Sequence, residues 1–474
     1  MSAGDAEATN TESRKVVAVL MERARIAQAA FAGSDQTRVD EAVRAMAWAI
    51  YKPEHAEELA RIAVADTGLG NVPDKIDKKQ RKTFGTLRDL LRVKSVGVIE
   101  EDPALGIVKY AKPVGIVGAV TPSTNPGATA ANKGMMAIKG RNAMIVAPSP
   151  LGYTTTARAV ALMREGLARI GLPEDLLQVL PQPVTKHLTQ AMMEAVDLVV
   201  ITGSQDNVRR GYMSGTPAIG VGTGNVPVIV DETADLDAAA AKIAQSKIFD
   251  NSTSCSSENA VVIVDAVYER AIAALERAGA YLCAPEKKAD IETALWQGDK
   301  LNRHLIAKDA GVLARAFGLP RDADAARFFL VEETSIGPDF PLSSEKLSLV
   351  LTVYRARDFA DAKDIVRRIL DHQGRGHSLG IHTANMDRAR ELAADLDVVR
   401  VLVNFAHTFA HGGSFDSGLP FTLSMGCGSW QKNSISENLN YKHFLNITHL
   451  VTPIPERRPT EAELFGPHWE KYGR

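Results

Sequence analysis

The stretch that decides the fold is residues 143–180, AMIVAPSPLGYTTTARAVALMREGLARIGLPEDLLQVL. It begins with an apolar run at residues 143–147, continues with apolar residues at helical spacing over 153–170, and ends with a second apolar run at 176–180. A strand, a helix and a strand in this order are typical of a parallel sheet whose crossover connections are helices. The stretch therefore predicts a doubly wound α/β architecture of the nucleotide-binding kind.

The same alternation continues on both sides of this stretch. A helical pattern at residues 231–248 and a segment of small polar residues then lead into a second α/β series. We therefore expect a Rossmann-type dinucleotide-binding domain over residues 1–95 and 112–230, and a second α/β domain over residues 231–432. The other strands expected in the two sheets are residues 114–120, 198–201, 260–264, 328–331 and 349–353.

Helices precede these domains, and a β arm accompanies them. Residues 14–31 carry apolar side chains at helical spacing, which indicates either a packing helix or an encapsulation or docking peptide. A second helical block is expected over residues 37–67, ending at a Gly- and Pro-rich turn. Short β-branched runs broken by prolines, and a polar end of the chain, predict an oligomerisation arm and tail over residues 96–111 and 433–474.

Composition limits the kinds of partner. The chain has 474 residues, 45% hydrophobic and 24% charged, which is enough for two or three domains with proper cores. Its 55 basic and 57 acidic residues give a net charge of −2, and no polybasic tract stands out. We therefore expect small-molecule partners, with no nucleic acid and no membrane surface.

The apolar runs and the cysteines indicate the compartment. The longest apolar runs fall far short of the ~20 residues needed to span a bilayer, and the polar N-terminus does not have the pattern of a signal peptide. The three cysteines form no CxxC pair, which argues against a disulfide framework and against a thiolate metal site. We expect a cytoplasmic protein without a bound metal.

Cys255 lies in a run of small hydroxylated residues, 252–257, between a helix and a strand. Structural thiols usually lie in apolar runs, so this setting is unusual. A nucleophilic thiol needs backbone N–H donors or a helix N-terminus to lower its pKa, and a Ser-rich turn can present such donors. Local sequence leaves both a nucleophile and an inert thiol open. Cys283 and Cys427 lack such a setting, so we expect both to be buried small residues.

Three loops have the character of phosphate-binding or ligand-binding loops. ITGSQ at residues 201–205 follows a strand and opens a helix, where Gly203 and Ser204 would let a phosphate approach the helix N-terminus. GVGTGN at 220–225 precedes a strand and is equally compatible with a tight turn. TPSTNP at 121–126 closes a strand, where the Asn125 amide would face the carboxyl edge of the sheet.

These loops and several other blocks resemble the aldehyde dehydrogenase superfamily, in its coenzyme A-acylating branch. The resemblance extends over residues 14–452 and implies an aldehyde dehydrogenase-like fold. The blocks that carry it, in chain order, are KPVGIV (112–117), TPSTNP (121–126), KGRN (139–142), APS (147–149), GVGTGN (220–225), FDN (249–251), CSSE (255–258), EKLS (345–348), GHSLGIH (376–382), GCGSW (426–430) and NSISEN (433–438).

The resemblance implies that Cys255 attacks the aldehyde carbon and that the Asn125 amide holds the resulting oxyanion. Hydride transfer to NAD or NADP would then leave a thioester on Cys255. Hydrolytic members have a glutamate general base in the glycine-rich loop, whereas Val221 stands there in this chain. Since valine accepts no proton, the thioester should persist until coenzyme A attacks it.

The resemblance also assigns a cofactor site. Glu345 would hold the ribose near the nicotinamide, or else be a solvated carboxylate. Ala147 and Pro150 stand where many members place a lysine and a glutamate around the adenosine ribose, so NAD and NADP are both admissible. The full set of expected cofactor-binding residues is Thr121, Pro122, Ser123, Thr124, Pro126, Pro148, Ser149, Gly203, Ser204, Gly222, Gly224 and Glu345.

Three histidines complete the expected site. His377 would accept the proton of the coenzyme A thiol, because imidazole titrates near neutrality, or would serve as a structural hydrogen-bonding residue. His407 and His411 would bind an anionic tail of the aldehyde, or would be surface loop residues.

The resemblance implies sulfoacetaldehyde as substrate, with succinate semialdehyde, acetaldehyde and propionaldehyde as alternatives, and a homodimer or homotetramer as the assembly. A hydrolytic aldehyde dehydrogenase and a non-catalytic scaffold remain as other interpretations.

Overall fold

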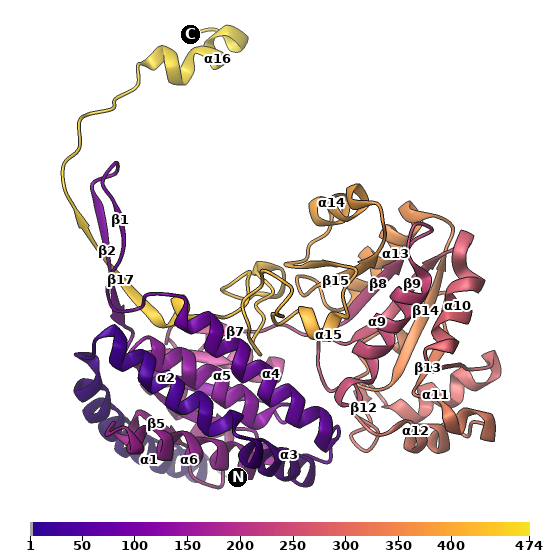
Figure 1. Ribbon diagram of the computed structural model, residues 1–474, viewed down its shortest axis with the longest axis horizontal. Helices are drawn as coiled ribbons and strands as arrows, with labels where there is room; N and C mark the ends of the chain where they lie inside the picture. The colour runs from indigo at the N-terminus through magenta and orange to yellow at the C-terminus, as the bar shows by residue number, and fades with distance from the viewer. Residues whose placement is uncertain (1–2) are drawn as a thin grey trace.

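The computed structural model describes residues 3–474 and contains two parallel sheets, each covered by helices, a three-stranded antiparallel sheet, and a two-stranded antiparallel one formed by β11 Trp296–Gln297 and β12 Lys300–Leu301 (Figure 1). The expected mixed α/β class is confirmed. Residues 1 and 2, which the expected first domain included, lie outside the described residues.

The first sheet has five parallel strands in the order β5-β4-β3-β6-β7. Its strands are fully apolar runs because helices cover both faces, as parallel sheets require. The expected strand, helix and strand of residues 143–180 are present as β4, α6 and β5. The bounds are β3 Ile116–Thr121, β4 Ala143–Pro148, β5 Leu177–Val179, β6 Leu198–Ile201 and β7 Ala218–Gly220, with α5 Pro126–Lys139, α6 Tyr153–Arg169, α7 Lys186–Ala195 and α8 Gln205–Tyr212.

Four N-terminal helices belong to this part of the molecule: α1 Ala3–Ala32, which packs on the strands of the sheet, and α2 Gln36–Tyr51, α3 Pro53–Thr67 and α4 Val72–Leu91, which pack on α5, α6 and one another. The apolar face of α1 is buried in the core of the first sheet, with Phe31 fully enclosed, as a packing helix would be. The helical block expected over residues 37–67 is present and ends at Thr67 as expected, but it is divided into two helices, α2 and α3. Pro53 occupies the first position of α3, where its ring and missing N–H end the preceding helix.

The second sheet has seven parallel strands in the order β10-β13-β14-β9-β8-β15-β16. Strand β8 pairs with β9 and β15 and so belongs to the second sheet. The domain boundary expected at residue 230 therefore lies one strand too far along the chain. The bounds are β8 Val226–Val230, β9 Glu258–Val264, β10 Ala280–Leu282, β13 Phe328–Glu332, β14 Val350–Ala356, β15 Leu379–His382 and β16 Val401–Val403, with α9 Leu236–Ile248, α10 Tyr268–Arg277, α11 Lys288–Leu295, α12 Ala310–Ala316, α13 Phe359–His372, α14 Met386–Asp395 and α15 His407–Ala410.

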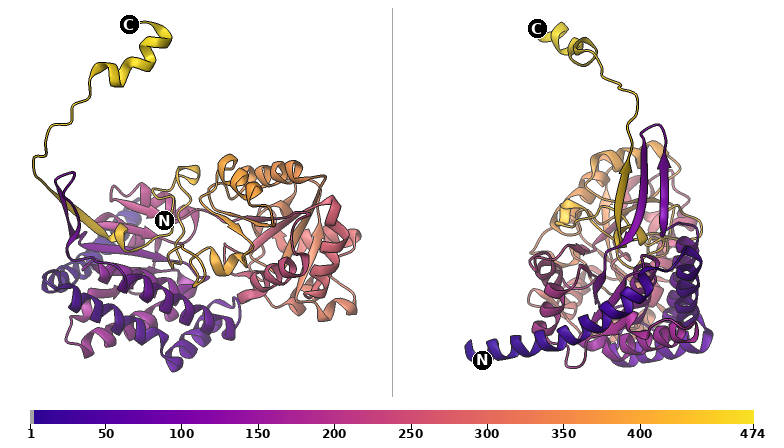
Figure 2. Two further views of the ribbon diagram at one scale, coloured as in Figure 1. Left: turned by 45° about the horizontal axis from the view of Figure 1, so that its top comes forward. Right: turned by 90° about the vertical axis from the view of Figure 1, so that its left-hand side faces the viewer.

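A three-stranded antiparallel arm projects from the first sheet and its helices. It consists of β1 Gly97–Asp102, β2 Ile107–Pro113 and β17 Leu445–Val451, with β2 in the centre. Beyond it an extended segment leads to α16, Glu461–Tyr472, which lies away from the body of the molecule (Figures 1 and 2). Within residues 3–474, none of the helices combines the length and the apolar character needed to cross a membrane.

Candidate active site

Cys255 lies in the cysteine loop, residues 249–257, which joins the end of α9 to the start of β9. Residues 250–252 have left-handed backbone conformations, with φ of 50°, 51° and 63°. Residues other than glycine rarely adopt this conformation, and it persists only where surrounding contacts impose it. One such contact is the hydrogen bond that Asn251 Nδ2 donates to Asp309 Oδ1 at 2.7 Å. The loop is therefore a firmly held turn.

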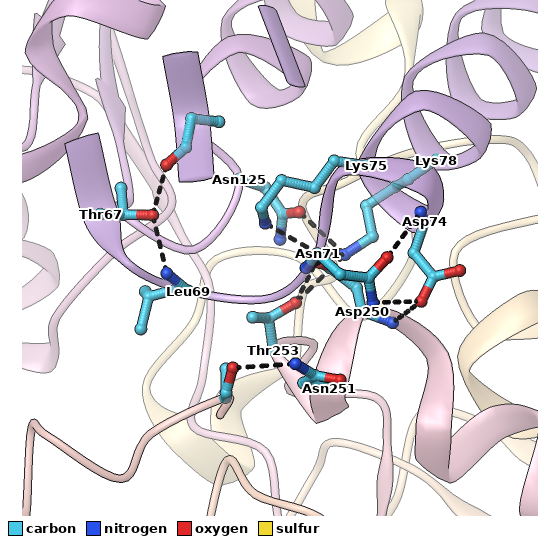
Figure 3. Close-up of polar contacts among 12 residues, drawn as sticks. Thr67, Leu69, Asn71, Asp74, Lys75, Lys78, Asn125, Asp250, Asn251 and Thr253 are labelled. Atoms are coloured by element: carbon cyan, nitrogen blue, oxygen red, sulfur yellow. Dashed lines mark hydrogen bonds and ion pairs between the residues drawn. The ribbon is translucent and has the colours of Figure 1, made fainter. Parts of the chain in front are cut away.

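Asp250 is the centre of a polar cluster that ties this loop to α4 (Figure 3). Its Oδ2 accepts hydrogen bonds from Lys78 Nζ at 2.6 Å, Lys75 Nζ at 3.0 Å and Thr253 Oγ1 at 2.7 Å. Its Oδ1 accepts one from the backbone N–H of Asn71 at 3.1 Å. Burial alone would raise the pKa of Asp250, but the two ammonium groups outweigh burial and lower it. The buried carboxylate is therefore ionised.

Asn125 immediately precedes α5, and its amide is oriented by the same cluster. Lys78 Nζ donates to Asn125 Oδ1 at 3.1 Å and to Thr253 Oγ1 at 3.3 Å, so one ammonium group bridges the amide and the cysteine loop. Among the described residues, the amide Nδ2 has no acceptor. Asn125, Ser254 and Ser256 line one pocket, so Asn125 lies beside the loop that carries Cys255. This is the arrangement that an oxyanion-binding amide requires.

The Cys255 thiol is only partly exposed, and its acidity differs from the expectation. Burial, with Glu345 and Cys427 nearby, raises the pKa of Cys255 to about 12, while Arg400 and the residue's own backbone N–H oppose that rise. The backbone N–H that the Ser-rich turn offers does lower this pKa, but burial outweighs it in the free protein. The neighbouring hydroxyls bond to each other, as Ser254 and Ser256 do at 2.7 Å. The thiol is protonated until a bound group changes its surroundings.

Most of the expected cofactor residues lie together at the carboxyl edge of the first sheet. Thr121 ends β3, Pro148 ends β4 in register with it, and Ser204 caps the N-terminus of α8 directly after β6. Thr121 Oγ1 and Ser149 Oγ are buried without a hydrogen-bond partner in the described part of the chain, and so is Glu345 Oε1. Buried polar atoms of this kind normally have partners, so these three suit a bound polar ligand such as a dinucleotide.

Glu345 lies in the loop before β14, on the side of the second sheet, and its backbone N–H donates a hydrogen bond to Gln373 Oε1 at 2.8 Å. Burial raises the pKa of Glu345 to about 8, although Lys346 and Lys247 oppose this. The carboxyl group is therefore mostly neutral at pH 7, which contradicts the alternative of a solvated carboxylate. Its effect on the pKa of Cys255 indicates that the two side chains lie near each other.

The glycine-rich loop packs directly against the cysteine loop. A Cβ at Gly224 would lie 2.1 Å from the carbonyl oxygen of Cys255, and one at Gly222 would lie 2.7 Å from Cys427 Sγ. Gln431 holds the loop through two hydrogen bonds with the backbone of Thr223, at 2.7 and 2.9 Å. The two glycines are therefore required by packing within the protein. Val221 is buried, with 9% exposure.

The three expected histidines form a buried stack. The His411 ring lies 4.5 Å from the His377 ring and 5.5 Å from the His407 ring, and all three side chains are at most 1% exposed. Burial, with Arg400 nearby, lowers the pKa of His377 to about 3, and it lowers the pKa values of His407 and His411 well below 6.5. The expected titration of His377 near neutrality is therefore wrong. Neutral, enclosed His407 and His411 are also unsuited to binding an anion.

Comparison with known proteins adds to this geometry. The model of the aldehyde dehydrogenase family matches residues 6–293. An acylating sulfoacetaldehyde dehydrogenase of Cupriavidus necator is 51% identical over 97% of this chain and 94% of its own length. The chain belongs to the aldehyde dehydrogenase family. Another acylating sulfoacetaldehyde dehydrogenase, of Bilophila wadsworthia, is 42% identical over 97% of this chain and 100% of its own length. An acetylating aldehyde dehydrogenase from Geobacillus thermoglucosidasius matches in structure with a TM-score of 0.90 and 33% identity, over 95% of this chain and 99% of that one.

These matches confirm the expected resemblance to the acylating branch, and this aldehyde dehydrogenase is an oxidoreductase. The described residues contain no group of three or more His, Cys, Asp or Glu side chains that could hold a metal ion.

The sequence analysis of this aldehyde dehydrogenase missed α4. Its inward face consists of lysines, and Lys75, Lys78, Lys79 and Lys82 are all 4–5% exposed. Their spacing of i, i+3, i+4 and i+7 places them on one face of a helix, which a search for charged helical faces would have found. Such a face is usually solvated. In this structure it is buried against the cysteine loop.

Proposed function

We propose that this enzyme oxidises sulfoacetaldehyde to sulfoacetyl-CoA, with NAD or NADP as hydride acceptor and coenzyme A as acyl acceptor. The substrate is supported by the 51% identity, over nearly the whole chain, to a relative named for that reaction. One observation supports the acylating step: the glycine-rich loop, which packs on the cysteine loop, has Val221 where a basic carboxylate would be needed for hydrolysis.

The sequence of bond changes follows from the site. The Cys255 sulfur, once deprotonated, forms a bond to the aldehyde carbon, and the oxygen that gains negative charge is held by Asn125 Nδ2. The bound dinucleotide accepts the hydride that leaves this carbon. A thioester to Cys255 remains, and the sulfur of coenzyme A replaces Cys255 on the acyl carbon, with loss of the proton of the coenzyme A thiol.

Water competes poorly for this thioester. Val221 accepts no proton, and Glu345, the carboxyl group near Cys255, is mostly protonated at pH 7 because burial raises its pKa to about 8. A general base must be unprotonated to activate water. The thioester therefore has the lifetime that an external thiol needs. His377 remains our proposed acceptor for the coenzyme A proton, because its Nε2 has no partner among the described residues, and it can take this proton only when bound ligands reverse the lowering of its pKa.

Cofactor choice and assembly are parts of the same proposal. Ala147 and Pro150 bring no carboxylate to the edge where the adenosine ribose would lie, so a 2′-phosphate meets no repulsion and NADP is as suitable as NAD. The projecting arm of β1, β2 and β17 exposes Ile447, Leu450 and Val451, which supports a homodimer or homotetramer in which a second copy covers these side chains. We place the enzyme in the cytoplasm, where its three cysteines would remain reduced.

The test is a comparison of turnover with and without coenzyme A. Purified enzyme is given sulfoacetaldehyde and either NAD or NADP, and reduced dinucleotide is followed by absorbance while sulfoacetyl-CoA is identified by mass spectrometry. We expect steady turnover only with coenzyme A, and the thioester as product. Equal rates and free sulfoacetate without coenzyme A would overturn the acylating reaction. Faster turnover of succinate semialdehyde would overturn the substrate.

A further inference from the structure

The pocket in front of the cysteine loop has a cationic wall. It is lined by Asn125, Ser254 and Ser256 on the side of Cys255, and by Lys78, Arg81 and Lys82 from α4 on the other. Lys78 belongs to the Asp250 cluster, whereas Lys82 and Arg81 lie further along the helix. The positive groups therefore face the place where the aldehyde must bind.

The charges of Lys82 and Arg81 are not compensated. Within residues 3–474, neither side chain forms an ion pair, because Asp250 is taken by Lys75 and Lys78. Lys82 Nζ donates only to backbone carbonyls, to Gly412 at 2.6 Å and to Gly413 at 3.4 Å. A buried ammonium group without a carboxylate is costly, so a ligand that supplies negative charge would be strongly favoured there.

Arg81 has an unused donor as well. Its guanidinium donates to the carbonyl of Phe409 at 3.1 Å, but its Nε is buried and has no acceptor among the described residues. Burial lowers the pKa of Arg81, and Asp77 and Asp416 oppose this through space, but neither forms an ion pair with it. Aromatic rings enclose both cations, with Arg81 4.3 Å from the Phe409 ring and Lys82 5.4 Å from the Phe421 ring. These rings exclude water, which strengthens any interaction with an anion.

We propose that Lys82 and Arg81 form the subsite that binds the sulfonate of the substrate and selects anionic aldehydes over neutral ones. The inference rests on the proposed function, because it assigns residues to one end of that substrate. In sulfoacetaldehyde a single methylene separates the aldehyde carbon from the sulfonate, so the anion must bind within the pocket that holds the aldehyde. Lys82 and Arg81 line that pocket, whereas the buried histidines do not.

Substrate entry requires the cations to move. The free space in the pocket is about 20 Å3, close to the volume of one water molecule. Lysine and arginine side chains have several rotatable bonds, so Lys82 can exchange the carbonyls of Gly412 and Gly413 for sulfonate oxygens. Burial and the positive neighbours Arg81 and Lys78 lower the pKa of Lys82 well below its usual value, and a bound anion would reverse that effect.

The first experiment compares two aldehydes that differ only in this group. Propionaldehyde has a methyl where sulfoacetaldehyde has the sulfonate, and kcat/KM is measured for both with coenzyme A. In Lys82→Met we expect kcat/KM to fall about thirtyfold more for sulfoacetaldehyde than for propionaldehyde. Lys82→Arg keeps the charge, so it should retain most of the wild-type kcat/KM for sulfoacetaldehyde relative to propionaldehyde. Equal losses for the two substrates in Lys82→Met would overturn the inference.

The matched control is Lys79→Met. Lys79 lies on the same helix, is equally buried, and has no ion pair within the described residues, but it does not line this pocket. Replacing Lys79 should change kcat/KM by the same factor for both aldehydes. A preference for propionaldehyde in Lys79→Met as large as in Lys82→Met would show that any buried lysine of α4 has this effect, and would overturn the subsite.

A second experiment separates this inference from the proposed function. Ethanesulfonate carries the anion without an aldehyde, and its dissociation constant is measured by calorimetry on the intact enzyme. We expect Lys82→Met to weaken this binding at least about tenfold. Unchanged binding would overturn the subsite even if sulfoacetaldehyde is the substrate. If the wild type does not oxidise sulfoacetaldehyde but binds ethanesulfonate through Lys82, the proposed substrate fails while the anion subsite is supported.

Discussion

Two clusters of buried basic side chains lie near Cys255, and they differ in charge. On one side the lysines of α4 contact the carboxylate of Asp250, which is fully buried. On the other side His377, His407 and His411 stack on each other, and the polar side-chain contact of the stack is with the Ser378 hydroxyl, at 2.9 Å from both His377 and His407. The clusters share burial and basicity, but only one contains a counter-charge.

This difference follows from the ordinary pKa values of the two residue types. At pH 7 the free energy needed to remove the proton from an imidazole with a pKa near 6.5 is less than about 1 kcal/mol. For a lysine the same step costs about 5 kcal/mol. The histidines therefore become neutral on burial. The lysines of α4 stay charged where a carboxylate is available, as at Asp250, and otherwise favour an anionic ligand. Positive charge near Cys255 thus comes from Arg400 and from α4, and not from the histidines.

The largest expected effect is that of removing the counter-charge. Asp250→Asn keeps the shape of the side chain but leaves Lys75 and Lys78 buried without a carboxylate. We expect the free energy of unfolding to fall by about 3–5 kcal/mol, the range for breaking a buried ion pair. Turnover should fall as well, because Asp250 also holds Thr253 in the cysteine loop. Denaturant unfolding at pH 7 measures the first effect.

A matched control is Asp309→Asn. Asp309 also contacts the cysteine loop, through Asn251, but it is exposed and pairs with no lysine in the described structure. An asparagine there still offers an oxygen to Asn251, so the loss should stay within about 0.5 kcal/mol. If the two variants lost equal stability, the lysines of α4 would not depend on Asp250, and the contrast with the histidines would have no electrostatic cause.

A somewhat smaller effect is expected at the amide that the cationic side orients. Asn125→Ala removes the donor for the oxyanion, which should raise the barrier by about 3 kcal/mol and lower kcat by about a hundredfold. Because the oxyanion forms from every aldehyde, the loss should be the same for sulfoacetaldehyde and propionaldehyde. Steady-state kinetics with both substrates measures it. A loss confined to sulfoacetaldehyde would instead make Asn125 part of the anion subsite.

The sequence could predict features that depend on neighbouring residues in the chain, but not features that depend on contacts with distant segments. Most strands of the two parallel sheets were predicted because each is an apolar run bounded by Gly, Pro or polar residues, and residues 198–201 agree in extent with β6, whereas the short strands β7, β10, β15 and β16 were missed. Cys255 and Asn125 were found through short motifs. The inward lysines of α4 were missed because their burial depends on Asp250, which lies 175 positions after Lys75. The pKa values of Cys255 and the histidines likewise depend on neighbours from distant segments.

The smallest of the three effects is expected on the histidine side and depends on pH. His411 has neither ring nitrogen bonded to any described residue, and burial lowers its pKa well below 6.5. The unfolded chain therefore takes up a proton below pH 6.5 that the folded protein does not. Since the unfolded state binds more protons in this range, stability rises with pH there and is lost as pH falls through about 6.5.

His411→Phe keeps a stacked ring but has no proton to take up. The wild type should lose about 2 kcal/mol more free energy of unfolding between pH 7 and pH 5 than this variant does, as measured by denaturant titration at the two values. His304→Phe is a suitable comparison, because this histidine is exposed and its replacement should leave the difference between the two pH values unchanged. If His411→Phe lost as much stability as the wild type, the imidazole of His411 would already be protonated in the folded enzyme. The histidine stack would then offer positive charge near Cys255 as α4 does, and the assignment of the sulfonate to Lys82 and Arg81 alone would be too narrow.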